Sequence, residues 1–241
     1  DRTAGGQGMM PCPILDSAGG IWKFDATKEN QTYGDGKRYA TGLRNVIGLD
    51  WNPQANKLYV AQHGRDQLNT FFPSLYTDAQ NAELPAETFY EINDGDNAGW
   101  PYVYYDNFQH KKIVSPEYGG DGKKEGASDI KNPAVAFPAH MAPMGVLFYT
   151  GDQFPASYKN QLFIAKHGSW NRSTKSGYEV VLARMDSTGT VTNQEIFVTG
   201  WLDTESQEAW GRPVDVQELK DGSLLISDDV ANCIYRVTYS K

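Results

Sequence analysis

The stretch Leu58-Tyr59-Val60-Ala61-Gln62-His63-Gly64 decides the fold, because it returns further along the chain as Leu162-Phe163-Ile164-Ala165-Lys166-His167-Gly168. A more divergent third copy, Leu-Leu-Ile-Ser-Asp-Asp, runs from Leu224 to Asp229. Each copy follows a turn-rich segment and lies between two further apolar runs. Short recurring strands separated by Gly, Asn, Asp and Pro are typical of a radial β array. The sequence therefore predicts an all-β protein with a β-propeller fold.

We expect antiparallel blades of about four strands each. The end of one blade is expected at about 19–43, whole blades at about 44–138 and 139–200, and a last partial blade at about 210–240. The expected strands lie near 20–24, 38–41, 46–51, 57–62, 87–92, 112–114 or 134–137, 145–149, 161–166, 178–184, 195–198, 214–218, 223–228 and 233–239. The best helical candidate, Asp78 to Glu91, is interrupted by Pro85.

Propellers close on themselves, since an open array would leave bare sheet edges. The expected strands fill only about half to two-thirds of a ring. We therefore expect a second chain, or a segment that precedes Asp1, to complete it.

Composition excludes several classes of function. The 22 basic and 30 acidic residues give a net charge of −8, whereas a nucleic-acid binder needs a basic footprint. No apolar run approaches the ~18 residues of a membrane span. The chain has no Walker loop, dinucleotide fingerprint, serine elbow or HExxH motif. Four scattered His and two distant Cys give no convincing zinc site.

The two cysteines, Cys12 and Cys233, lie near opposite ends of the chain. Because a closed propeller brings its ends together, they either form a disulfide, which would indicate an oxidising compartment, or remain free thiols. The sequence leaves both alternatives open.

Polar residues recur where the expected strands begin and end. The turns His63-Gly64 and His167-Gly168 leave equivalent strands, and glycine lets backbone carbonyls face a ligand such as calcium. Arg44, His140 and Arg212 precede equivalent inner strands and suit a planar anionic ligand. The alternative is structural: an arginine paired with a neighbouring carboxylate, and turns in which histidine caps a strand.

Seven motifs then follow in order: Ala40-Thr41-Gly42-Leu43-Arg44-Asn45, His63-Gly64-Arg65-Asp66, Gly99-Trp100-Pro101-Tyr102, Pro116-Glu117-Tyr118-Gly119-Gly120, His140-Met141-Ala142-Pro143, His167-Gly168-Ser169-Trp170-Asn171-Arg172 and Gly211-Arg212-Pro213. Together they resemble the pyrroloquinoline-quinone (PQQ) sugar dehydrogenases of the soluble glucose, sorbosone and fungal pyranose dehydrogenase type. The resemblance covers nearly the whole chain.

The resemblance implies a six-bladed propeller with PQQ and Ca²⁺ near its axis. Arg44 and Asn45 would contact the quinone, and the carbonyls of Gly64 and Arg65 would hold calcium, which polarises the quinone C5 carbonyl. The remaining cofactor-site residues would lie around the quinone carboxylates or the substrate: His140, Lys166, His167 and Arg212. A histidine base takes the sugar hydroxyl proton while hydride passes to C5. That histidine normally precedes the part of the family matched here, so the catalytic residue is unassigned.

The chain departs from the family at three positions. Ile47 stands where the glucose branch has a polar Gln, which favours the sorbosone and pyranose branch. Val103 and Ser128 stand where many relatives have cysteines.

The predicted function is PQQ- and calcium-dependent oxidation of an aldose or a sorbosone-like sugar by a secreted or periplasmic protein, with an external electron acceptor. The alternative is a non-catalytic propeller of the same family that serves as a binding or assembly module. A calcium-dependent lactonase on a similar propeller is a third class, but its carboxylate and Asn ligands cannot be assembled from this sequence.

Overall fold

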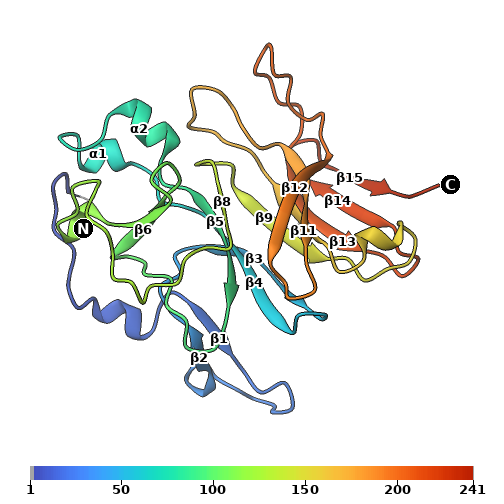
Figure 1. Cartoon of the computed structure of the whole chain (residues 1–241), viewed down its shortest axis with the longest axis horizontal. Coiled ribbons are helices and arrows are strands. Elements are labelled where there is room, and N and C mark those ends of the chain that lie inside the picture. The colour runs from blue at the N-terminus through green and yellow to red at the C-terminus, as the bar shows by residue number, and fades with distance from the viewer. Residues whose placement is uncertain (1–2, 241) are drawn as a thin grey trace.

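The computed structural model describes residues 3–240, so Asp1 lies outside the described residues. The fold is all-β, with antiparallel sheets and a few short helical segments (Figure 1). Its strands are β1 (Ile21–Lys23), β2 (Lys37–Ala40), β3 (Val46–Asn52), β4 (Lys57–Gln62), β5 (Glu87–Ile92), β6 (Val103–Asp106), β7 (Lys111–Val114), β8 (Val135–Phe137), β9 (Pro143–Phe148), β10 (Leu162–Lys166), β11 (Glu179–Met185), β12 (Val191–Val198), β13 (Pro213–Glu218), β14 (Leu224–Asp228) and β15 (Cys233–Val237). The helices are α1 (Leu68–Phe71) and α2 (Asp78–Glu83), with 3₁₀ turns at Pro13–Asp16, Tyr33–Asp35, Pro116–Tyr118 and Ala156–Tyr158.

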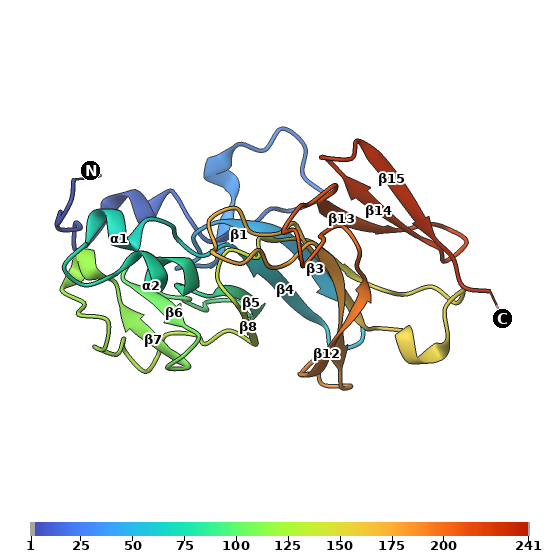
Figure 2. The same ribbon diagram turned by 90° about the horizontal axis from the view of Figure 1, so that it is seen from above.

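The strands form successive antiparallel sheets, which gives a β-propeller-like architecture. Two sheets have four strands, in the orders β3-β4-β5-β8 and β9-β10-β11-β12. A three-stranded sheet, β13-β14-β15, follows them, and the pair β1-β2 precedes them. The hairpin β6-β7 is inserted between β5 and β8. The sheets follow one another across the molecule (Figures 1 and 2), and among residues 3–240 no sheet closes the array.

The two ends of the chain lie on opposite sides of the molecule (Figure 1), because the described sheets do not close into a ring. Cys12 and Cys233 are accordingly both free thiols. Of the two alternatives left open by the sequence, the structure has the unpaired one.

The repeated apolar phrase is explained by strands that are buried on both faces. In β4, Tyr59 and Ala61 enter a core shared with the next sheet, while Val60 faces a core shared with β1-β2. In β10, Leu162 and Ile164 enter the first of these cores, while Phe163 faces a third core, shared with β13-β15. A strand with two buried faces needs no polar alternation. Each core therefore lies between consecutive sheets.

The inner strands of neighbouring sheets approach closely at glycine. A Cβ on Gly48 of β3 would lie 2.0 Å from the carbonyl oxygen of Met144 in β9. A Cβ on Gly145 of β9 would lie 2.0 Å from Oδ1 of Asp215 in β13. The same strands are joined by a hydrogen bond, because the backbone N–H of Phe148 donates to Asp50 Oδ2 at 2.7 Å.

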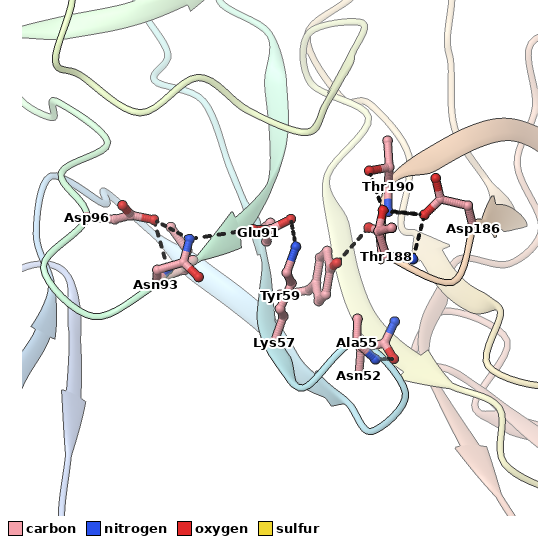
Figure 3. Close-up of polar contacts among 12 residues, drawn as sticks. Asn52, Ala55, Lys57, Tyr59, Glu91, Asn93, Asp96, Asp186, Thr188 and Thr190 are labelled. Atoms are coloured by element: carbon pink, nitrogen blue, oxygen red, sulfur yellow. Dashed lines mark hydrogen bonds and ion pairs between the residues drawn. The ribbon is translucent and has the colours of Figure 1, made fainter.

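Tyrosine hydroxyls also join neighbouring sheets. Tyr59 donates to the carbonyl of Gly189 at 2.6 Å (Figure 3), and Tyr149 donates to that of Gly222 at 2.8 Å. The turn that receives Tyr59 is itself ordered by Asp186, whose Oδ1 accepts hydrogen bonds from Thr188 and Thr190.

Most expected strands lie within a few residues of their observed positions. Both alternatives, 112–114 and 134–137, contain strands, but only β8 completes the four-stranded sheet. Helix α2 begins after the N-cap Thr77 and ends before Pro85, as the proline requires. Helix α1 and strand β6 were not predicted. No helix within residues 3–240 is long and apolar enough to cross a membrane.

We expect Gly48→Ala to destabilise the fold by about 1–3 kcal/mol, because the added methyl overpacks against the Met144 carbonyl. Urea unfolding measures the change. Gly34→Ala is the matched control, since its Cβ would meet only Thr32 Oγ1, at 3.7 Å. Equal stability of the two variants would contradict the close approach of the inner strands.

Candidate functional site

The first candidate turn follows β4 and is bound by Arg44, which lies just before β3. Arg44 Nη1 donates to the carbonyls of Gly64 at 2.6 Å and of His63 at 3.4 Å. The Arg44 guanidinium lies over the Trp100 ring, 5.6 Å from its centroid. Asn45, the next residue, is exposed, and its carbonyl accepts the His63 N–H at 3.0 Å.

The second candidate turn follows β10 and repeats this chemistry from a different sheet. Arg212, just before β13, donates from Nε to the His167 carbonyl at 2.9 Å and from Nη2 to the Gly168 carbonyl. The His167 ring contacts Asp229 Oδ1 at 2.9 Å. Arg44 thus binds the turn of its own sheet, whereas Arg212 binds the turn of the preceding one.

The segment before β9 joins the two turns. The His63 ring contacts the Pro143 carbonyl at 3.0 Å. The backbone N–H groups of His167 and Gly168 donate to the carbonyls of Ala142 and Met141, each at 2.9 Å. The turns after β4 and β10 are therefore brought together at the segment that leads into β9.

His140 is buried between two oxygen acceptors. Its Nδ1 lies 3.2 Å from Asp66 Oδ1, and its Nε2 lies 2.8 Å from the Asn81 carbonyl. Because both partners accept, the ring is held as an imidazolium that donates from both nitrogens. Burial alone would lower the pKa of His140, but the hydrogen bonds to Asp66 and Asn81 outweigh it and raise that pKa. The hydrogen bond from His140 in turn lowers the pKa of Asp66.

The buried carboxyl group of Glu87 forms a hydrogen bond with the first turn. Glu87 accepts the backbone N–H of Gly64 at 2.9 Å, and burial raises its pKa to about 7. Lys166 is also buried and pairs with Glu179 across the sheet at 3.1 Å. Burial lowers the pKa of the Lys166 ammonium. The structure therefore places Lys166 in an ion pair within its own sheet.

A cavity of about 1070 Å³ opens beside the first turn. Of the cofactor and metal residues predicted from sequence, Arg44 and Arg65 are among the described residues that line it. The N-terminal stretch of the wall was not identified from the sequence. Asp66, Trp100, Glu117 and Trp170 also line the cavity, and they lie in the quoted motifs, where they were given no role.

Arg65 shows why sequence reasoning could not assemble this wall. Its side chain is buried, and Nη1 lies 2.6 and 2.7 Å from the two carboxylate oxygens of Glu117. The resemblance gave a role only to the backbone carbonyl of Arg65 and no partner to its side chain. The sequence does not show which distant carboxylate faces the guanidinium.

The described residues form no cluster of side chains that could hold a metal ion. Within residues 3–240, no three His, Cys, Asp or Glu side chains are grouped to hold one. The carbonyl of Gly64, expected as a calcium ligand, accepts the hydrogen bond from Arg44 instead.

A family model and two curated relatives match this chain. A model of the TrAA12-like family matches residues 19–240. An uncharacterised protein of Borreliella burgdorferi is 37% identical over 203 residues, which cover 84% of this chain and 48% of that protein. A pyrroloquinoline quinone-dependent pyranose dehydrogenase of Coprinopsis cinerea is 26% identical over 162 residues, which cover 61% of this chain and 21% of that protein.

Solved structures share the fold at low identity. The calcium structure of a Trichoderma reesei carbohydrate-active enzyme of family AA12 has a TM-score of 0.75 at 18% identity, covering 97% of this chain and 63% of that one. The PQQ domain of the Coprinopsis cinerea pyranose dehydrogenase in its holo form has a TM-score of 0.60 at 20% identity, covering 85% and 56%. The chain spans about half, or less, of the length of the curated relatives named above.

We expect the His140 ring to titrate above the ordinary imidazole pKa of 6.5 and that of His63 below it, because burial dominates at His63. Asp66→Asn should lower the pKa of His140, since it removes the charged acceptor. NMR ring-proton shifts against pH, in metal-free buffer, measure both. Asp229→Asn, beside His167, is the matched control and should leave the His140 pKa unchanged.

The raised pKa of His140 also makes the stability of the fold depend on pH. A folded-state pKa above the unfolded value means that protonated His140 stabilises the fold at low pH. This contribution is lost as the pH rises through the raised pKa. A His140 pKa at or below 6.5 would contradict the imidazolium assignment.

Proposed function

The chain belongs to the TrAA12-like family, and from this we propose that it acts in the PQQ-dependent oxidation of a pyranose or sorbosone-like sugar. The observation that carries the proposal is the meeting of both arginine-bound turns at the segment that leads into β9, together with the cavity beside the first turn, whose wall includes Arg44. The electron acceptor would be external, and the location secreted or periplasmic.

The quinone fits the residues of the cavity. PQQ is a planar ring system with carboxylates, and when bound it supplies the C5 carbonyl carbon that accepts hydride from the sugar. Arg44 offers a guanidinium fork and Trp100 an aromatic face at the same wall. These two residues would hold and orient the quinone. Asn45 would also contact the quinone, and His140, Lys166, His167 and Arg212 would lie around the quinone carboxylates or the substrate.

Calcium does not fit the Gly64 carbonyl in the arrangement described. Arg44 Nη1 already donates to that oxygen at 2.6 Å, and a divalent cation beside a guanidinium is repelled. The carbonyls of Gly64 and Arg65 would therefore hold calcium only after Arg44 has moved away from Gly64.

Two of the described histidines are already engaged by neighbouring groups. His140 is held protonated between Asp66 and Asn81, and the His63 ring is engaged with the Pro143 carbonyl. The catalytic base stays unassigned.

The proposal includes completion of the ring. The sheet β13-β15 has three strands and the pair β1-β2 has two, so both have unpaired edges, and Ile47 and Leu49 of β3 are exposed. A segment that precedes Asp1, or a second chain, would cover these edges, as soluble sheets require.

Dye reduction tests the activity. Protein supplied with PQQ and Ca²⁺ is expected to bind the quinone, seen by its absorbance, and to reduce a redox dye when D-glucose, L-fucose or sorbosone is added. Omission of PQQ should abolish the signal. Quinone binding without turnover would favour the non-catalytic binding module. Absence of quinone binding by the complete ring would overturn the proposal.

Calorimetric titration with Ca²⁺ tests whether Arg44 and calcium compete for the Gly64 carbonyl. We expect Arg44→Gln to bind Ca²⁺ more tightly than the unmodified protein, because the competing guanidinium is removed. Arg212→Gln, which frees the equivalent turn, is the matched control. Unchanged affinity in Arg44→Gln would show that calcium does not use the Gly64 carbonyl.

A further inference from the structure

Trp170 combines high exposure with a place in the cavity wall. Its side chain is 71% exposed, although it lines the same cavity as Arg44, Asp66 and Glu117. A single exposed aromatic residue is ordinary on a protein surface. Its significance here depends on how its neighbours are held.

The backbone is anchored on both sides of Trp170. Ser169 is fully buried; its N–H donates to the Ser176 carbonyl at 2.9 Å and its carbonyl accepts the Tyr178 hydroxyl. On the other side, Asn171 Nδ2 donates to Asp66 Oδ1 at 3.3 Å. The indole thus projects from a fixed backbone.

Arg172 strengthens this anchor. Its Nη2 lies 2.7 Å from both carboxylate oxygens of Glu83, and its Nη1 donates to the carbonyls of Ala82 and Ala139 at 3.2 Å. The guanidinium therefore bonds to three acceptor groups at once, which fixes its orientation as well as its position. An exposed side chain on an anchored loop is pre-organised for a ligand, because the loop loses little conformational entropy on binding.

The chemistry of the wall selects the ligand. An indole offers a broad apolar face, and the carboxylates of Asp66 and Glu117 accept hydrogen bonds. Both carboxylates are partly exposed, with 34% and 25% of their side-chain surface open. A pyranose has the matching form, since its ring presents an apolar C–H face and a rim of hydroxyl donors. An open-chain polyol has the hydroxyls without the rigid face.

The quinone has a different place in this arrangement. Arg44 lies over Trp100, so the anionic planar ring is matched by that pair. Trp170 comes from the loop after β10 and leaves its own face exposed.

We propose that Trp170 is a specificity-determining residue that stacks on the pyranose ring of the substrate. This rests on the proposed function for the sugar being a substrate. It also requires the sugar to bind the protein in the absence of quinone.

Sugar binding without quinone is the first test. D-Glucose, L-fucose and D-xylose are titrated into the protein, with sorbitol as the acyclic comparison, and saturation-transfer NMR follows binding. Trp170→Ala is expected to weaken pyranose binding about tenfold, or ~1.4 kcal/mol. Trp170→Phe should retain most of the affinity, and sorbitol binding should not change. Trp51→Ala is the matched control, because Trp51 is 46% exposed but is not among the described residues that line the cavity.

The second test separates this inference from the proposed function. In the dye assay, Trp170→Ala should raise KM for the sugar with kcat and quinone absorbance unchanged. Trp170-dependent sugar binding without dye reduction would overturn the proposed function and leave the stacking role standing. Normal dye reduction with an unchanged KM in Trp170→Ala would overturn the stacking role, as would loss of quinone binding alone. Failure of every pyranose to bind the unmodified protein would overturn it too.

Discussion

The close approach of the inner strands controls this structure. At Gly48 and Gly145 no Cβ fits between neighbouring strands, and Asp50 joins β3 to β9 at the same level. Because these strands are held together, the segments that enter and leave them are close as well. The turns after β4 and β10 therefore meet the segment before β9. The candidate site follows from packing in the inner strands, where larger residues would push the sheets apart.

The two arginine-bound turns show how structural and functional interpretations of one motif coexist. Each turn presents two successive carbonyls, and Arg44 or Arg212 donates to both. Such carbonyls need partners, which a guanidinium or a cation can supply equally. From the sequence we expected turn carbonyls that bind a cation and arginines that bind an anionic ligand. We did not expect these arginines to donate hydrogen bonds to the turn carbonyls themselves. Calcium at Gly64 is therefore linked to the position of Arg44.

The sequence was informative where local pattern and burial coincide. The copies in β4 and β10 could be recognised because both faces of each strand are buried, so their apolar residues are uninterrupted. The end of α2 could be predicted because Pro85 cannot continue the helix. The pairs His140 with Asp66 and Arg65 with Glu117 could not, since each joins segments far apart in the chain. The type of a side chain shows which kind of partner it can bind, but only the fold determines which residue becomes that partner.

The ends of the strands and the loops between them contribute different parts of the cavity wall. Arg44 and the turn at Gly64 belong to the ends of strands, whose positions are fixed by the cores between sheets. Glu117 and Trp170 belong to loops, and arginine–glutamate pairs join these loops to neighbouring segments: Arg65 binds Glu117, and Arg172 binds Glu83 of α2. Partly buried pairs of this kind contribute geometry more reliably than net stability. Loop residues can therefore change the fit of a ligand without moving the strand ends, which is why we assign specificity to Trp170 and quinone contact to Arg44.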